Sequence, residues 1–322
     1  MERIQMEAEL KSLQEKLSLL KNEIKKSDEE ESSINNIIKH LEETTLTLKT
    51  ELYRKITPFE RVQLARNPGR PTTIDYIKYL LTDFIQLHGD RLYMDDLAIV
   101  SGIGFFEGIP VTVIGHQKGR DTKDNLKRHF GMPHPEGYRK ALRMMKQAEK
   151  FKRPIICFID TPGAYPGIGA EERGQGEAIA VNLAKMSMLK TPIISIITGE
   201  GGSGGALALG VADRVFMLAN TVYSVISPEG CASIIWKDSS KAPEAADVMK
   251  MDPNNLLRMG VIDDIIEEPQ GGAHEDFEET MDNVKTKLII ALEELSQYSE
   301  EDLLENRYKK IRQLGFFSIE GN

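Results

Sequence analysis

The stretches RPIICFI (residues 153–159) and TPIISII (residues 191–197) are two copies of one short apolar segment, 38 residues apart. Each copy runs directly into a glycine-rich turn and then into a segment with helical character. Short buried strands that alternate with helices are typical of α/β architecture. Strands repeated in this way are expected to be neighbours in one sheet. The sequence therefore predicts that the turns DTPGAYPG (residues 160–167) and GEGGSGG (residues 199–205) lie at the same sheet edge.

Composition limits the classes of protein to which the chain can belong. Its 322 residues are 40% hydrophobic, which is enough for a substantial core, and no apolar run is long enough for a membrane span. The charged first nine residues do not have the pattern of a signal peptide. A net charge of −9 argues against nucleic acid as the main partner. Cys157 and Cys231 are too few for a disulfide framework or a four-cysteine zinc site, so we expect a cytoplasmic protein with reduced thiols.

The N-terminal part, residues 1–57, has a heptad pattern of apolar residues that predicts a helical hairpin. Polar residues 27–33 separate its two halves. A thin apolar seam of this kind favours a docking arm for another subunit over a solvated spacer. The seam residues are Leu10, Leu13, Leu17, Leu20 and Ile24 in the first helix, and Ile34, Ile38, Leu41, Thr45, Leu48 and Leu52 in the second.

Residues 58–296 are predicted to form the main domain, and residues 297–322 a C-terminal helix. Thr72 or Thr73 is a candidate cap for a helix through about Leu87. Alternating apolar residues then predict a β-hairpin. The remaining expected elements are a helix over 138–151, strands over 214–218, 222–226 and 261–266, and acidic helices over 278–295 and 300–314.

The turn at residues 199–205 matches three functional patterns. Gly199, Gly201 and Gly204 have the spacing of a dinucleotide-binding loop. That loop requires an acidic residue at the end of the next strand to bind a ribose. The next strand ends in Ala219 and Asn220, so the required acid is missing.

The second pattern is the nucleophile elbow, formed by Gly201, Ser203 and Gly205. A hydrolase would also need an aspartate and then a histidine further along the chain. Asp263 and His274 supply that order, and His274 is the only histidine after Ser203. Its glycine-rich surroundings indicate a solvated loop, which weakens this interpretation.

In the third pattern, backbone amides rather than side chains would bind the reacting group. Gly202, Gly204 and Gly205 have no side chains, so an oxygen of a ligand can approach their amides closely. Amides at a helix N-terminus are unpaired and favour negative charge, as an oxyanion site requires. Gly163 and Ala164 in the other turn could add a further donor. A tight turn that only packs needs fewer glycines than this.

Three other features allow weaker interpretations. The basic loop, residues 118–134, could contact an acidic carrier domain or a CoA phosphate, or could simply be solvated. Its Lys and Arg residues are Lys118, Arg120, Lys123, Lys127 and Arg128. His116, His129 and His134 have no recognised metal-ligand spacing, so we expect no metal in this chain. Lys250 lies in a Met-Lys-Met triplet like that around a biotinylated lysine, but residues 243–247 favour a helix, and we expect it to be unmodified.

Several segments together resemble the alpha-subunit family of acetyl-CoA carboxylase carboxyltransferases. The resemblance extends from about residue 58 to residue 274. The matching segments are HGDR (88–91), GRDTKD (119–124), PHPEGYRK (133–140), DTPGAYPG (160–167), AEERGQ (170–175) and YSVISPEG (223–230). The resemblance implies a crotonase-like α/β fold of strand–strand–helix repeats wound into a superhelix. It also implies transfer of a carboxyl group from carboxybiotin to acetyl-CoA, giving malonyl-CoA in fatty acid biosynthesis.

The same resemblance implies site residues and partners. Gly204 and Gly205 match the positions whose amides stabilise the biotin ureido oxyanion. The turn residues Gly163, Ala164, Tyr165 and Pro166, together with Gly202, would line the pocket for carboxybiotin and the acyl-CoA. The implied partners are a beta subunit in an alpha2-beta2 assembly, the biotin carboxyl carrier protein and a separate biotin carboxylase that uses ATP. Zinc is expected only in the beta subunit, and no covalent cofactor is expected in this chain.

Overall fold

The computed structural model describes residues 2–24, 31–53 and 56–315, which divide into two compact units at Thr57 and Pro58. The first unit consists of α1 (Glu2–Ile24) and α2 (Glu31–Tyr53), which pack against each other. Both predicted helices are therefore present. Of the predicted turn between them, residues 27–30 lie outside the described residues and residues 31–33 begin α2.

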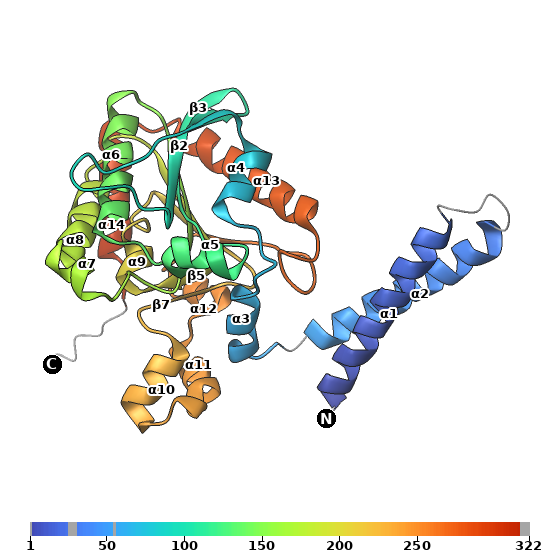
Figure 1. The fold of residues 1–322 in the computed structure, drawn as a ribbon. Coiled ribbons are helices and arrows are strands. Elements are labelled where there is room, and N and C mark those ends of the chain that lie inside the picture. Colours follow the sequence, from blue (N-terminus) through green and yellow to red (C-terminus); the bar gives the residue numbers. More distant parts are fainter. Residues whose placement is uncertain (1, 25–30, 54–55, 316–322) are drawn as a thin grey trace, which may run out of the picture. The chain divides into compact units, whose positions relative to one another are not determined.

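The second unit is built on one mixed sheet with the strand order β1-β2-β3-β4-β5-β6-β8 (Figure 1). The pairs β1–β2 and β2–β3 are antiparallel, and the strands from β3 to β8 run parallel. β7 pairs with the end of β5. The strands are β1 (Thr82–Gln86), β2 (Ile99–Phe106), β3 (Ile109–His116), β4 (Ile155–Thr161), β5 (Ile193–Gly202), β6 (Arg214–Leu218), β7 (Val222–Ser224) and β8 (Asp264–Ile266).

Helices cover both faces of this sheet. The described helices of the second unit are α3 (Pro58–Ala65), α4 (Thr73–Leu80), α5 (Thr122–Lys127), η1 (His129–Gly131), α6 (Pro135–Lys150), α7 (Ile168–Glu172), α8 (Gln175–Met186), α9 (Ser203–Leu207), α10 (Pro228–Trp236), η2 (Ser239–Lys241), α11 (Ala242–Met249), α12 (Pro253–Arg258), α13 (Phe277–Leu295) and α14 (Glu300–Arg312). None of the described helices combines the length and the hydropathy that crossing a bilayer requires.

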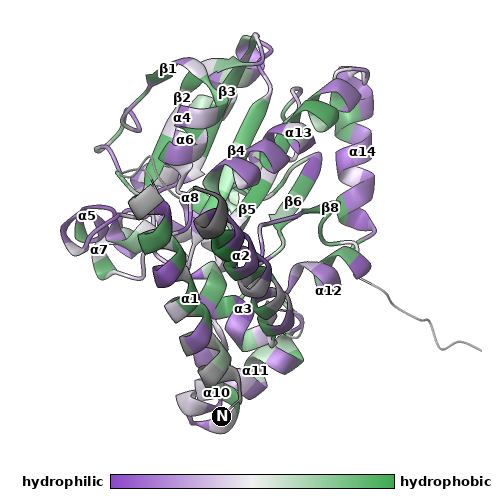
Figure 2. Ribbon diagram, turned by 90° about the vertical axis from the view of Figure 1, so that its right-hand side faces the viewer, coloured by the Kyte–Doolittle hydropathy of each residue, from purple (hydrophilic) through white to green (hydrophobic). Residues whose placement is uncertain are grey.

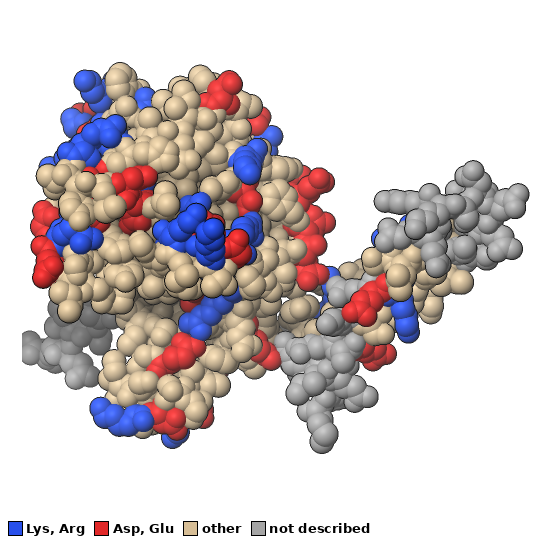
Figure 3. All heavy atoms as spheres, in the orientation of Figure 1, with Lys and Arg blue, Asp and Glu red and all other residues tan. Residues whose placement is uncertain are grey.

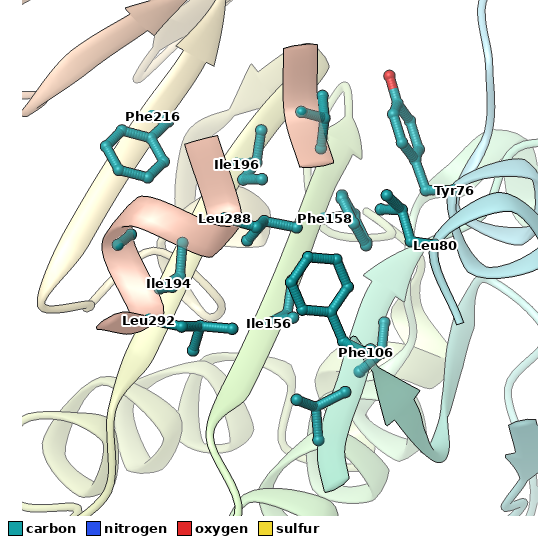
Figure 4. Packing of buried hydrophobic residues seen from close by; sticks show 14 of the residues in the cluster. Tyr76, Leu80, Phe106, Ile156, Phe158, Ile194, Ile196, Phe216, Leu288 and Leu292 are labelled. Carbon is teal, nitrogen blue, oxygen red and sulfur yellow. The ribbon is translucent and has the colours of Figure 1, made fainter. Parts of the chain in front are cut away.

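The apolar copies 153–159 and 191–197 are central strands because both of their faces are buried. In β4, Ile156 and Phe158 join α4 and α13 in one core cluster (Figure 4), and Phe158 stacks on Tyr76 with ring centroids 4.8 Å apart. Ile155 and Cys157 of the same strand point to the other face, where α6 and α8 supply methionines. A strand covered on both faces has no polar alternation, which explains its continuous apolar sequence. Figure 2 shows the hydrophobic character of these strands.

The predicted helix from residue 72 to about 87 is too long. It ends at Leu80, and residues 82–86 form edge strand β1 instead. The reason lies in its partner strand: a Cβ added at Gly102 would lie 2.3 Å from the carbonyl oxygen of Ile85. Glycine at this position of β2 therefore admits a strand that a larger residue would displace. The other predicted strands are present, although β7 and β8 are both shorter than expected.

The C-terminal helix α14 is held against the rest of the second unit by one buried cation. Arg307 is 1% exposed and forms an ion pair with Asp213 at 2.8 Å. It also donates to the carbonyl oxygens of Met186, Leu189 and Thr191. The residues that connect α8 to β5 are thereby bonded to α14.

Candidate functional site

The two glycine-rich turns meet at one edge of the sheet, as the repeat predicts. β4 and β5 are parallel neighbours whose register runs from Ile155 opposite Ile193 to Thr161 opposite Gly201, with an irregularity after Ile159. Both turns therefore leave the carboxyl ends of adjacent strands. This edge is where ligands bind in open α/β sheets.

Two of the glycines in the second turn are required by this close approach. A Cβ at Gly202 would lie 2.2 Å from the carbonyl oxygen of Pro162, and one at Gly205 would lie 2.6 Å from the carbonyl carbon of Gly163 and 2.8 Å from the amide nitrogen of Ala164. Real Cβ atoms do not come this close to backbone atoms. The absence of side chains at Gly202 and Gly205 thus lets one turn pack on the other.

Gly204 is different, because its missing side chain is not explained by packing. A Cβ there would meet only side-chain carbons of Ile179, at 3.5 and 3.6 Å, which is ordinary van der Waals contact. Ser203, immediately before it, has a φ of 52° and is exposed, and it opens the short helix α9. The first amides of a helix have no partner within the helix and lie at its positive end. The amides of Gly204 and Gly205 are thus donors of the kind that an oxyanion requires.

The first turn is shaped by its own hydrogen bonds. The hydroxyl of Thr161 donates to the carbonyl oxygen of Gly163 at 2.7 Å and accepts from the amide of Gly163 at 3.1 Å. The amide of Tyr165 donates to the carbonyl oxygen of Pro133, which ties this turn to the start of α6. Ala164 and Tyr165 are half-buried and Pro166 is exposed. The pocket residues expected in this turn are therefore accessible to a ligand, except Gly163, which is buried.

Beneath the turns lies a small apolar cluster of Tyr138, Ala178 and Ala208, with Ala164 and Ile179 packed against it. It connects α6, α8 and the end of α9 to both turns, so the positions of the turns depend on packing from three helices.

His116 lies beside these turns and is 1% exposed. Burial lowers the pKa of His116 to about 4, and the charge of Asp160 opposes that shift. The imidazole is therefore neutral near pH 7 and places no positive charge beneath the amides.

A charged network, which the sequence did not predict, borders the same edge. Lys118 Nζ lies 2.6 Å from Asp160 Oδ1 and 3.4 Å from Glu200 Oε2, and Arg66 Nε lies 2.7 Å from Glu200 Oε1. The amide of Glu200 also donates to Asp160 at 2.9 Å. The carboxylates of Asp160 and Glu200 are thus bonded to cations and hold the two turns together.

The end of β5 is anchored by a second ion pair. Arg70 is 3% exposed, donates twice to the carbonyl oxygen of Thr198, and pairs with Glu268. Asn220 donates to Glu268 at 2.8 Å. Arg70 is not among the predicted site residues, and in the structure it bonds β5 to Glu268.

The cations of the basic loop are only partly free. Lys118 is engaged as above, Arg120 pairs with Asp75, and Arg128 pairs with Asp124. Lys123 and Lys127 are exposed on α5, where Figure 3 shows Lys and Arg side chains gathered on one face. Any contact of this loop with an acidic partner would therefore involve chiefly these two lysines.

The geometry does not support the hydrolase pattern. Asp263, which would have to orient a histidine, accepts from the amide of Val215 at 2.6 Å and from Lys310. His274 Nε2 lies 3.0 Å from Asn67 Nδ2. Among the described contacts of Asp263, none links it to His274, so Ser203 has no relay that would activate it.

A glutamate acting as acid or base, as a hydratase would need, has no good candidate here. Glu200 is held by two cations, and Glu171 and Glu172 are exposed on α7. The carboxylates of Asp160 and Glu200 in these turns are therefore paired with cations, and the backbone amides remain as candidate donors.

The triplet around Lys250 has the predicted local structure. α11 ends at Met249, Lys250 follows in a left-handed conformation with a φ of 51°, and α12 starts at Pro253. A biotinylated lysine sits on a hairpin between strands, and Lys250 does not.

An apolar groove of about 420 Å³ opens beside Ser203. Leu183, Leu207, Tyr223 and Val225 are among its lining residues. Leu207 is 37% exposed and Val225 78% exposed, so one side of the site presents apolar surface to solvent. Exposed apolar surface beside a polar site marks a place where a ligand or another protein binds.

Comparison with known proteins gives close relatives over nearly the whole chain. Residues 3–315 match the model of the family described as acetyl co-enzyme A carboxylase carboxyltransferase-like. A protein of Alkaliphilus oremlandii is 62% identical over 270 residues, covering 84% of this chain and 85% of its own length. A protein of Bacillus velezensis is 55% identical over 318 residues, covering 99% of this chain and 97% of its own length. Both are named acetyl-coenzyme A carboxylase carboxyl transferase subunit alpha.

Solved structures of similar fold include a transcarboxylase and a malonate decarboxylase. Transcarboxylase 12S superposes with a TM-score of 0.58 at 19% identity, over 73% of this chain and 44% of that chain. A Pseudomonas malonate decarboxylase hetero-dimer gives a TM-score of 0.55 at 21% identity, over 68% of this chain and 89% of that chain. At these identities the likeness concerns the fold, and it agrees with the predicted crotonase-like class.

Proposed function

The chain belongs to the acetyl co-enzyme A carboxylase carboxyltransferase family, and from this premise we propose that it is the alpha subunit of a two-subunit carboxyltransferase. With a beta subunit it transfers the carboxyl group from carboxybiotin, carried on the biotin carboxyl carrier protein, to acetyl-CoA. The product is malonyl-CoA, and the reaction is the first committed step of fatty acid biosynthesis.

The role of this chain in the reaction is to stabilise negative charge with backbone amides. When the carboxyl group leaves the ureido nitrogen of carboxybiotin, charge accumulates on the ureido oxygen. The amides of Gly204 and Gly205, at the start of α9, are the donors for that oxygen. Losing one such donor raises the barrier by about 3 kcal/mol, or roughly a hundredfold in rate. When bound, carboxybiotin would release its carboxyl group as CO2 and supply the base for the acetyl methyl proton, so that the new carbon–carbon bond forms to CO2.

The observation that carries this proposal is the open space at Gly204. Packing accounts for glycine at 202 and 205, whereas at 204 a methyl group would meet only Ile179. A ligand oxygen that approaches the amide closely accounts for glycine at this position. The bonded state of Asp160 and Glu200 is a second support, because it leaves base chemistry to the substrate.

The pocket walls follow from the same proposal. The first turn would supply Ala164, Tyr165 and Pro166, and the second turn Gly202, while the buried Gly163 would only shape the first turn. Tyr165 presents an aromatic face that is already stacked on His134, with ring centroids 4.1 Å apart. A planar ureido ring suits a wall of this kind.

The proposed partners would supply the parts of the active site and the substrates that this chain does not provide. The exposed apolar surface at Leu207 and Val225 supports a site that is closed by the beta subunit in an alpha2-beta2 assembly. Biotin comes on the carrier protein, and ATP is used by a separate biotin carboxylase. In this proposal the beta subunit holds a structural zinc. The proposal places the enzyme in the cytoplasm.

The hairpin of residues 1–57 is proposed as a docking arm. Leu19 and Leu46 are 65% and 60% exposed, so both helices still offer apolar surface after packing on each other. Because the hairpin is a compact unit of its own, its deletion should leave residues 58–322 folded and weaken association with the beta subunit. Sedimentation of mixtures with and without the hairpin measures this; equal association of both forms would rule out a docking role.

The function is tested by measuring malonyl-CoA formation from carboxybiotin and acetyl-CoA. The purified chain alone should be inactive, and a cognate beta subunit should restore turnover. Turnover by the isolated chain would contradict the shared site. Absence of turnover from a complex whose native mass shows both subunits would contradict the proposed reaction, and a parallel assay with crotonyl-CoA would then identify a hydratase.

A further inference from the structure

Three side chains of metal-ligand type meet at the edge of the sheet where β2 begins. Asp96 precedes β2, His129 lies in η1, and His134 is the N-cap of α6. One candidate ligand atom from each of them lies within 4.8 Å of the others. Two imidazoles and a carboxylate are a donor set typical of zinc and related divalent ions. The spacing in the sequence gave no sign of it, because Asp96 is distant along the chain.

Asp96 is the reason to expect a cation here. Its side chain is buried, at 4% exposure, and its two oxygens accept from the amides of Ala98 at 2.8 Å and His134 at 2.7 Å. Within the described part of the chain, no basic side chain forms an ion pair with it. A buried carboxylate without a counter-cation is costly. A bound divalent ion would supply the missing positive charge.

The neighbouring acids differ from Asp96 in this respect. Asp95 pairs with Lys140 at 2.6 Å, and Glu136 pairs with Arg173 and Arg139. Lys140 acts on the carboxylate of Asp96 through space and donates to the backbone carbonyl of that residue, but it does not pair with the carboxylate itself. Lys127 and Arg173 line the same cavity, and Arg173 pairs with Glu136. Among the described residues neither of them forms an ion pair with Asp96.

The two imidazoles are arranged with access to solvent. Their centroids are 4.2 Å apart and their planes are inclined by 67°. Both rings line an open cavity of about 360 Å³ together with Asp96 and Glu136, so water can complete the coordination of an ion. His129 and Phe130 have φ values of 49° and 56°. Two successive left-handed residues without glycine are strained, and here they place His129 beside His134.

We propose that Asp96, His129 and His134 bind one divalent transition-metal ion of the zinc class, with water as the remaining ligand. The ion would fasten the segment of α5 and η1 to the start of β2. Since His134 stacks on Tyr165, the same ion would steady the wall of the turn at residues 160–167. This inference does not depend on the proposed carboxyl transfer, because metal binding is measured without any substrate.

The test is a metal titration of the untagged full-length chain after treatment with a chelator. Co²⁺ is added while its visible absorption is followed, and Zn²⁺ is then added to displace it. The wild-type chain should bind one equivalent of Co²⁺, and Zn²⁺ should abolish the signal. The variants His129→Gln and His134→Gln should each raise the Kd at least tenfold. In the control, His88→Gln removes an exposed histidine that contacts Asp95, and it should bind as the wild type does.

Thermal unfolding of the same samples gives a second readout. Zn²⁺ should raise the Tm of the wild type and of His88→Gln, and should leave the Tm of the other two variants unchanged. The His variants are preferred to a change at Asp96, since that carboxylate also accepts two backbone amides. No saturable binding by the wild type, or equal binding by His129→Gln and His134→Gln, would overturn the proposal.

Discussion

Replacing Arg307 by methionine will weaken the attachment of α14 more than any change on the exposed side of that helix. The guanidinium donates to both oxygens of Asp213, at 2.9 and 2.8 Å, and to three backbone carbonyls at 2.7 to 3.2 Å. Methionine retains apolar contact but leaves Asp213, whose side chain is 3% exposed, without its cation. Removing one partner of a buried ion pair costs about 3–5 kcal/mol. For a unit of this size that lowers the Tm by roughly 10 °C.

The assay is thermal unfolding followed by circular dichroism, with Arg312→Met as the matched control. Arg312 lies on the same helix and is exposed, so the same chemical change there should alter stability by less than about 0.5 kcal/mol. Combining Arg307→Met with Asp213→Asn should recover part of the loss, because the uncompensated charge is then gone. Equal Tm values for Arg307→Met and Arg312→Met would refute the argument that this ion pair holds α14.

Three further outcomes follow from the site. Gly205→Ala will reduce the free energy of unfolding by about 1–3 kcal/mol, because the new methyl carbon would lie 2.6 Å from backbone of Gly163; an unchanged urea midpoint would contradict this. Burial lowers the pKa of His116 to about 4 in the folded chain, against 6.5 ordinarily. The contribution of the neutral imidazole to the free energy of unfolding is therefore full above pH 6.5 and is lost as the pH falls to about 4. His116→Gln should remove that part of the pH dependence, on the order of 3 kcal/mol, and identical pH profiles for variant and wild type would disprove it. Glu200→Gln should leave kcat of the complex within about threefold, because Glu200 is an ion-pair partner; a loss of about a hundredfold would make it an acid or base.

The sequence predicted those parts of the fold that depend on local pattern. The two apolar copies are adjacent parallel strands, and the turns that follow them meet, because parallel neighbours end at one edge. The helix end predicted at about residue 87 is wrong, since α4 ends at Leu80. Residues 82–86 form a strand because Gly102 in the partner strand admits them, and nothing in residues 82–86 themselves indicates that.

The predicted site and the structure differ mainly in what each glycine does. Glycine content alone cannot distinguish Gly202, Gly204 and Gly205. In the structure, packing accounts for glycine at positions 202 and 205, whereas Gly204 has open space beside it. The ion pairs of Lys118 and Arg307 were not predictable, since their partners are distant in the chain and charged residues are common on any surface. The same holds for Asp96 beside His129 and His134.

Whether the amide of Gly204 takes part in the reaction can be decided by a rate measurement. It is the kcat for malonyl-CoA formation by the complex that contains Gly204→Ala, compared with Ser203→Ala and the wild type. The added methyl group meets only Ile179, at 3.5 and 3.6 Å, so the Tm should not change. Alanine keeps the amide hydrogen but puts a methyl group into the open space through which the ligand oxygen would reach it. If that amide stabilises the oxyanion, kcat should fall by up to roughly a hundredfold in Gly204→Ala and only modestly in Ser203→Ala. Wild-type kcat in Gly204→Ala, or an equal loss in Ser203→Ala, would contradict the account.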